Sequence, residues 1–162
     1  VKGHPHALNT QKPKTSIYNN ETAFIMSILY PMLALMALTS VMTMVLFFSR
    51  APLIIKFWGK AEGARHSDEL RPNLPARLRY ITDNYNHLFE QPTLFYAALV
   101  YIHLMSHTDG LHVQLAWAYV GLRVIHTIIH LTNNNVSWRA VVFGLSSACL
   151  VVMIAREGLA LL

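Results

Sequence analysis

Two sets of polar side chains recur at helical spacing inside segments that are otherwise apolar. The first set is Asp83, Asn86, His87 and Glu90, and the second is Arg123, His126, Thr127 and His130. Both follow an i, i+3, i+4, i+7 pattern, so each set lies along one face of a helix. Lipid does not tolerate such a face, and we therefore expect both sets to point into a shared polar site.

Guanidinium, imidazole and carboxylate groups at one site suit an anionic ligand. Arg123 and Arg139 would bind its carboxylates, because a planar guanidinium donates two parallel hydrogen bonds to such a group. Glu90 would bind an ammonium group of the same ligand. Asn86 and the histidines would add hydrogen bonds.

A metal site is the second interpretation of the same residues. His126 and His130 have the i, i+4 spacing that places two imidazoles on one ion, and Glu90 or His87 would complete the shell. Arg123 on the same face would repel a cation. This repulsion favours the anionic ligand, and no metal ligand is assigned.

The segments that hold these residues are long and apolar. Of the 162 residues, 54% are hydrophobic and only 13% are charged, against about 25% charged in a soluble domain. Apolar stretches cover 24–48 and, approximately, 78–105, 111–131 and 137–155. Each is close to or above the roughly 20 residues that a membrane-spanning helix needs. We expect an all-α, integral membrane four-helix bundle: a polar tail over 1–21 and a four-span domain over 22–162.

The net charge of +5 is concentrated in the segment that follows the first apolar stretch. Its basic residues are Arg50, Lys56, Lys60, Arg65, Arg71, Arg77 and Arg79. The positive-inside rule places this first loop in the cytoplasm and both termini on the opposite face. Because no basic helix with interleaved aromatics is present, nucleic acid is excluded as a partner, and anionic lipid headgroups are the expected counter-charge.

This topology brings the polar residues to a similar depth. Glu90 falls in the cytoplasmic half of the second span. His126 and His130 fall in the last two turns of the third span, and Arg139 falls in the first turn of the fourth. Three helices therefore present carboxylate, imidazole and guanidinium groups near the cytoplasmic face.

The amino-acid sequence around these residues resembles that of a known family. Asn86-His-Leu-Phe-Glu90-Gln-Pro is followed by Arg123-Val-Ile-His126-Thr127, and Arg139 comes 16 residues after Arg123. The pattern is similar to the membrane-associated proteins in eicosanoid and glutathione metabolism (MAPEG), and most to their bacterial branch. That family includes microsomal glutathione transferases and microsomal prostaglandin E synthase.

The resemblance implies a homotrimer of four-helix subunits that binds glutathione, as a co-substrate, between neighbouring subunits. The candidate glutathione-binding residues are Asn86, His87, Glu90, Arg123, His126 and His130. Glu90 would bind the amino group of glutathione, and Arg139 would be the catalytic residue that holds and activates its thiol. A guanidinium near sulfur favours the thiolate, which is the nucleophile.

The expected activity is that of a glutathione transferase or peroxidase acting on hydrophobic electrophiles that arrive from the bilayer. Phe143 stands where several relatives have Tyr, so a hydroxyl near the thiol is absent. A non-catalytic membrane protein that binds a lipid or an acidic small molecule, or regulates a membrane partner, is the alternative. A metal-dependent or proton-linked membrane protein is a third.

Overall fold

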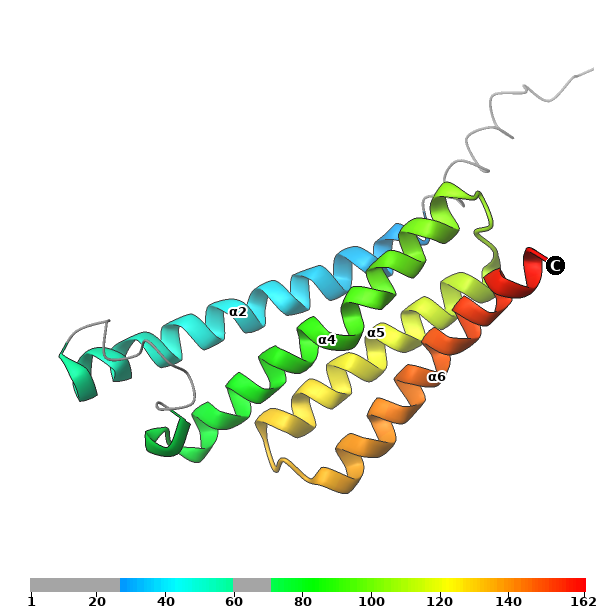
Figure 1. Cartoon of the computed structure of the whole chain (residues 1–162). Helices are drawn as coiled ribbons and strands as arrows, with labels where there is room; N and C mark the ends of the chain where they lie inside the picture. Colours follow the sequence, from blue (N-terminus) through cyan, green and yellow to red (C-terminus); the bar gives the residue numbers. More distant parts are fainter. Residues whose placement is uncertain (1–26, 60–70) are drawn as a thin grey trace, which may run out of the picture.

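The fold is built from four long helices that run antiparallel in chain order. The computed structural model describes residues 27–59 and 71–162. Its helices are α2 (Leu29–Trp58), α4 (Ala76–Leu104), α5 (Gly110–Leu131) and α6 (Val136–Ala160), with a 3-10 turn, η2 (Arg71–Asn73), before α4 (Figure 1). These ranges contain no strand. The prediction of an all-α four-helix fold is confirmed, while the predicted polar tail over 1–21 lies outside the described residues.

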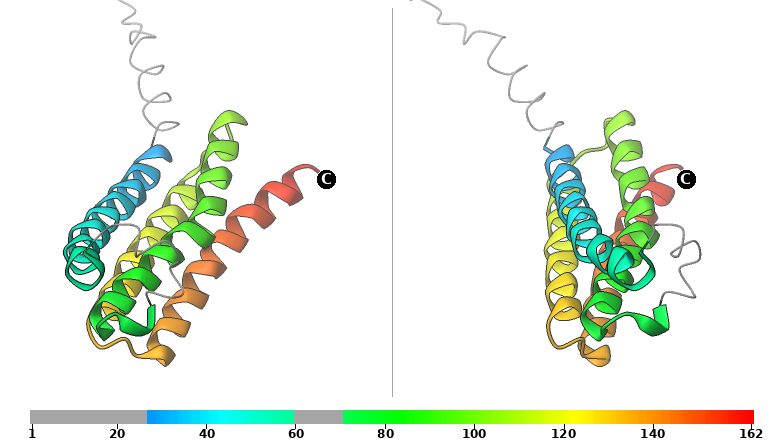
Figure 2. Two further views of the ribbon diagram at one scale, coloured as in Figure 1. Left: turned by 60° about the vertical axis from the view of Figure 1, so that its left-hand side comes forward. Right: turned by 90° about the vertical axis from the view of Figure 1, so that its left-hand side faces the viewer.

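Helices α4 and α5 form the centre of the bundle, and each of them contacts the other three helices. The two outer helices, α2 and α6, lie on opposite sides of this pair (Figure 2). Residues on α4, α5 and α6 can therefore meet inside one subunit.

Apolar side chains from all four helices fill the interior. Helix α6 contributes one stripe that includes Leu150 and Met153, and the rings of Phe95 and Tyr119 stack between α4 and α5 with centroids 4.2 Å apart. The buried core comprises Ile28, Leu35, Phe95, Leu99, Ile102, Ala116, Tyr119, Val120, Leu150 and Met153.

Much of the outer surface of the bundle is apolar. Large apolar side chains are exposed on every long helix, for example Phe48, Val100, Ile128 and Val151. A soluble monomer rarely exposes such continuous apolar surface. Two helices, Leu29–Lys56 and Val136–Ala160, are long and apolar enough to cross a membrane. We conclude that this is a membrane protein.

The first helix is longer than its apolar stretch predicts. We expected it to end near residue 48, but α2 continues past Arg50 and Pro52 to Trp58. Helical hydrogen bonds do not depend on apolar side chains, so the helix extends until a residue stops it. Gly59 does so: it adopts the left-handed conformation (φ 68°) and donates its N–H to the carbonyl of Ile55. Arg50 is therefore helical and does not belong to a loop.

A polar cluster joins the α4–α5 turn to the end of α6. Asp109 caps α5 by accepting a hydrogen bond from the His112 amide (2.8 Å), and it also pairs with Arg156. Nearby, His107 Nδ1 lies 2.7 Å from the Glu157 carboxylate, which is nearly buried. The cluster holds the end of the bundle that is remote from Arg139.

Asp109 should make stability depend on pH in the acid range. The Arg156 guanidinium, which donates hydrogen bonds to this carboxyl, holds its pKa below the ordinary value of 3.8. Because the folded-state pKa is the lower one, the stabilisation is complete above the unfolded value and is lost as the pH falls through the folded value. We expect Asp109→Asn, which keeps a capping oxygen, to flatten the decline in melting temperature below about pH 4.

The matched variant is Asp109→Ala, which also removes the helix cap. It should lower stability at neutral pH by about 1 kcal/mol, or roughly 2–4 °C in melting temperature. Thermal unfolding in detergent across a pH series measures both effects. An Asp109→Asn curve that runs parallel to the wild-type curve at low pH would contradict the assigned ion pair.

Candidate functional site

The polar set on α5 points into the subunit. Arg123, His126, Thr127 and His130 have relative exposures of 1%, 4%, 5% and 0%. They lie on the same helical face as the core residue Tyr119, so the packing that buries the apolar residues of α5 also buries these four. Helix α5 thus places three ionisable side chains in the interior of the bundle, next to apolar core residues.

Arg123 is the most unusual of these residues. Its guanidinium carbon lies 4.9 Å from the ring centroid of Phe143 and 5.2 Å from that of Tyr119. None of its three side-chain nitrogens has a hydrogen-bond partner within the described residues. Cation–π contacts offset part of the cost of burying the charge, but they satisfy none of the N–H donors. A buried cation with open donors is suited to an anionic ligand.

Three histidines form a triangle next to Arg123. The ring centroids of His87 and His126 are 5.9 Å apart, and the other two separations are both 5.7 Å, from His130 to His87 and from His130 to His126. Both ring nitrogens of His130 and the hydroxyl of Thr127 lack partners among the described residues. Within the same ranges no three His, Cys, Asp or Glu side chains are placed to hold a metal ion. These open groups can instead hydrogen-bond a polar ligand.

The polar set on α4 lies at the edge of the bundle, which differs from the expectation for that helix. The α4 face that packs inside the subunit carries Asn84 and Leu88. Glu90 is mostly exposed and its carboxylate lies 3.0 Å from His87 Nδ1. Asn86 is exposed as well.

Asp83 has a separate role from the rest of the α4 set. It forms an ion pair with Arg71 at 2.9 Å, and Arg71 belongs to the turn that precedes the helix. The pair joins η2 to the first turns of α4, so Asp83 has a partner outside the candidate site.

Arg139 lies in the first turns of α6, half-buried, at the same end of the bundle. Its Nη1 donates a hydrogen bond to the side-chain oxygen of Asn134 (2.6 Å). It is close enough to His126 and His130 for their charges to interact. The backbone N–H groups at this helix end carry partial positive charge. The Arg139 guanidinium and the N-terminus of α6 together make this end of the bundle electropositive.

The structure brings most of the candidate residues together and leaves two at the periphery. His87, Arg123, His126, His130 and Arg139 converge from three helices. Glu90 lies at the rim, near enough to Arg123 for an electrostatic attraction, and Asn86 faces outward.

Two polar residues between the helices lie outside the set that the sequence predicts. Asn84 is fully buried and neither of its side-chain polar atoms has a partner among the described residues. Its spacing of one turn before Leu88 would have identified it, because the two share the packed face. Gln91, which donates to the hydroxyl of Ser147 at 2.5 Å, carries no comparable signal: only the approach of α6 reveals it.

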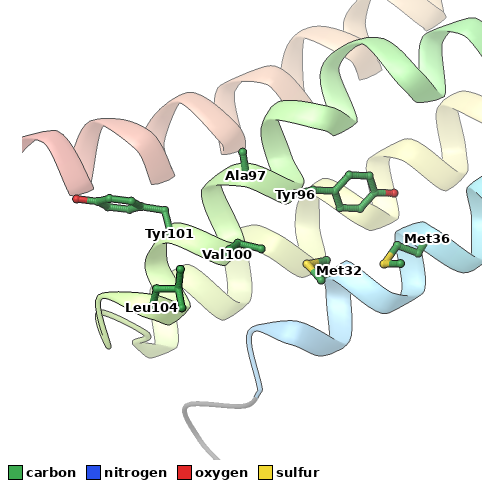
Figure 3. Close-up of a pocket in the computed structure, with 7 residues that line it drawn as sticks. All are labelled: Met32, Met36, Tyr96, Ala97, Val100, Tyr101 and Leu104. Atoms are coloured by element: carbon green, nitrogen blue, oxygen red, sulfur yellow. The ribbon is translucent and has the colours of Figure 1, made fainter.

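An apolar groove lies between α2 and α4, beyond the polar site along α4. Its volume is about 640 Å³. Figure 3 shows Met32 and Met36 of α2 on one side and Tyr96 and Val100 of α4 on the other. Tyr96 comes six residues after Glu90, or about 9 Å along a helix axis. The groove is suited to a hydrophobic molecule that is dissolved in the bilayer.

The fold and the site together define a class: an all-α membrane protein whose four helices enclose a cationic, histidine-lined site near one end. Comparison with protein families shows to which family within that class the chain belongs. Residues 28–159 match the MAPEG family, so the chain belongs to the MAPEG family, whose members are membrane-associated proteins of eicosanoid and glutathione metabolism. Comparisons with curated proteins and with solved structures found no match.

Proposed function

We propose that this protein is a membrane-embedded glutathione-dependent transferase or peroxidase that acts on hydrophobic electrophiles. The observation that carries the proposal is Arg123, a buried guanidinium whose three nitrogens have no hydrogen-bond partner among the described residues, in a site that also holds Arg139. Glutathione has two carboxylates, one ammonium group and one thiol. The two guanidinium groups, the imidazoles of the site and the rim carboxylate of Glu90 match that set of groups.

Arg139 is the proposed catalytic residue. A guanidinium at a helix N-terminus lowers the proton affinity of a nearby thiol, because both groups stabilise the negative sulfur. The thiolate then attacks an electrophilic carbon: a carbon–sulfur bond forms while the bond from that carbon to its leaving group breaks, and the leaving group departs with the electron pair. With a hydroperoxide the sulfur instead takes the terminal oxygen, the O–O bond breaks, and the alcohol leaves after it takes up a proton. A second glutathione thiol then converts the sulfenic acid to the disulfide and water. The same activated thiolate serves both reactions.

The binding site is proposed to be completed by neighbouring subunits of a homotrimer. Asn86 and Glu90 are exposed on α4 although this helix belongs to a membrane protein. Polar side chains on a spanning helix need a protein or water environment. A second copy would cover them and close the glutathione site between subunits. Chemical crosslinking in membranes that stops at three subunits tests this assembly.

The proposed topology has four spans, with the first loop in the cytoplasm and both termini on the opposite face. Helices α4 (29 residues) and α5 (22 residues) are long enough to span, although they carry the polar sets. The basic residues at the end of α2 and the start of α4 support this orientation. Hydrophobic substrates would enter sideways through the lipid-facing groove between α2 and α4.

An ultraviolet difference titration with glutathione tests the function. The purified protein in detergent should show a saturable thiolate absorbance band as glutathione is added. A band that depends on Arg139 would establish both the ligand and its activation. No band, together with no binding heat in calorimetry, would refute glutathione as the ligand.

A non-catalytic role is the second candidate, and Phe143 is the observation that favours it. Its ring covers the Arg123 guanidinium, where a tyrosine would also offer a hydroxyl. Such a protein would bind a lipid or an acidic small molecule without activating a thiol. Binding heat with glutathione but no thiolate band would support this candidate.

Glu90 gives a direct test of the binding mode. Glu90→Gln removes the charge that would pair with the ammonium group of glutathione, so we expect binding to weaken by about 1–3 kcal/mol. Isothermal calorimetry measures the change. The matched control is Asp83→Asn, a neutralisation on the same face of α4 at a residue that pairs with Arg71. Equal affinities for wild type and Glu90→Gln would make Glu90 a structural residue.

A further inference from the structure

The turn between α5 and α6 contains three consecutive asparagines with three different roles. Asn135 caps α6 by accepting a hydrogen bond from the Trp138 amide (3.1 Å). Asn133 accepts one from the Asn135 amide at 3.4 Å. Asn134, between them, is the residue whose side chain reaches Arg139.

The backbone of Asn134 is fixed by the end of α5. Its N–H donates to the carbonyl of Ile129 (2.8 Å), and its φ of 49° lies in the left-handed region. Among residues with a side chain, asparagine adopts this conformation most readily. Glycine would fit the backbone equally well but would present no acceptor. Asn134 thus combines a left-handed backbone conformation with a side-chain oxygen whose position is set by the hydrogen-bonded backbone.

That oxygen orients the Arg139 guanidinium. Asn134 Oδ1 accepts from Arg139 Nη1 at 2.6 Å, and Arg139 Nε has no partner among the described residues. A long arginine side chain has many rotamers, so an anchor at its end removes much of that freedom. The amide is neutral, and it therefore directs the guanidinium without cancelling its charge, as a carboxylate would do.

We propose that Asn134 is a positioning residue that holds the Arg139 guanidinium toward the thiol with its positive charge unpaired. This inference rests on the proposed role of Arg139. Asn134 itself does not touch the substrate: it acts through Arg139. The α5–α6 turn is accordingly part of the activating machinery as well as a connection between helices.

Two substitutions separate the anchor from the backbone. Asn134→Gly keeps the left-handed turn and removes the oxygen. We expect it to lower turnover by about 10- to 100-fold, with KM for glutathione little changed, and to move the thiolate band to higher pH. Asn134→Asp keeps the anchor but pairs the guanidinium with a negative charge, so it should also move the band to higher pH. Asn133→Gly, in the same turn, is the matched control and should leave the band in place.

The experiment is a pH titration of the thiolate absorbance in wild type and in these three variants, with KM and kcat measured in parallel. Suppose that Arg139→Ala abolishes the band but the pH profile of Asn134→Gly coincides with the profiles of wild type and Asn133→Gly. This result would overturn the positioning role of Asn134 and leave the proposed function intact. Wild-type protein without a thiolate band would overturn the proposed function and, with it, this inference. Melting temperatures close to that of Asn133→Gly would show that the Asn134 variants are folded.

Discussion

Replacing Arg139 by alanine is expected to abolish the thiolate band of bound glutathione and to reduce turnover by about 10²–10³-fold, the cost of removing one group that stabilises the developing charge. The guanidinium and the N-terminus of α6 both favour the anionic sulfur, and the variant keeps only the helix terminus. Binding of glutathione should fall less than turnover does, because Arg123 and Glu90 remain.

The difference titration and steady-state kinetics measure these effects of Arg139→Ala. The matched control is Arg156→Gln, which neutralises an arginine at the other end of α6, where its partner is Asp109. It should leave the thiolate band unchanged. Full activity in Arg139→Ala would move the catalytic role to another cation, with Arg123 the first candidate.

The second large effect is expected at Arg123, where ligand binding and stability should change in opposite directions. Burying a charge without a hydrogen-bonded partner costs free energy, and an apolar side chain of similar volume avoids that cost. Arg123→Met should therefore keep or raise the melting temperature without ligand. The same change should weaken glutathione binding by about 1.5–3 kcal/mol, because it removes charged hydrogen bonds to the ligand.

Thermal unfolding with and without glutathione measures the change in stability of the Arg123 variant, and calorimetry measures the change in glutathione affinity. Arg123→Lys is the matched variant: it keeps the charge but loses the planar fork that lies between Phe143 and Tyr119. Its affinity should be intermediate. A strongly destabilised Arg123→Met variant with normal affinity would show that Arg123 serves the fold.

Helix content and membrane character could be predicted from the sequence because they depend on local composition. A long apolar stretch forms a helix in lipid whatever its neighbours are, since its backbone must satisfy its own hydrogen bonds. The buried face of α5 was also predictable. Arg123, His126 and His130 keep the period of a helix, which predicts one shared inward face, and the structure buries that face together with Tyr119.

The rotation of α4 about its own axis was not predictable in the same way. Polar residues lie around most of its first half, from Asp83 and Asn84 to Glu90 and Gln91, so periodicity could not select one inward face. Packing against α2 and α5 selected the face with Asn84 and left Glu90 exposed at the rim. The length of α2 was uncertain for a related reason: the helix ends at Gly59 and not where its apolar residues end.

What the sequence by itself determined is the set of groups at the site: two guanidiniums, three imidazoles and a carboxylate at similar depth on three helices. Tertiary structure alone decided their partners. Arg123 lies between two rings from different helices, and Arg139 is held by Asn134 across a turn. Helical periodicity acts along one chain segment, whereas these contacts depend on how separate helices and turns pack, and only the folded bundle sets those distances.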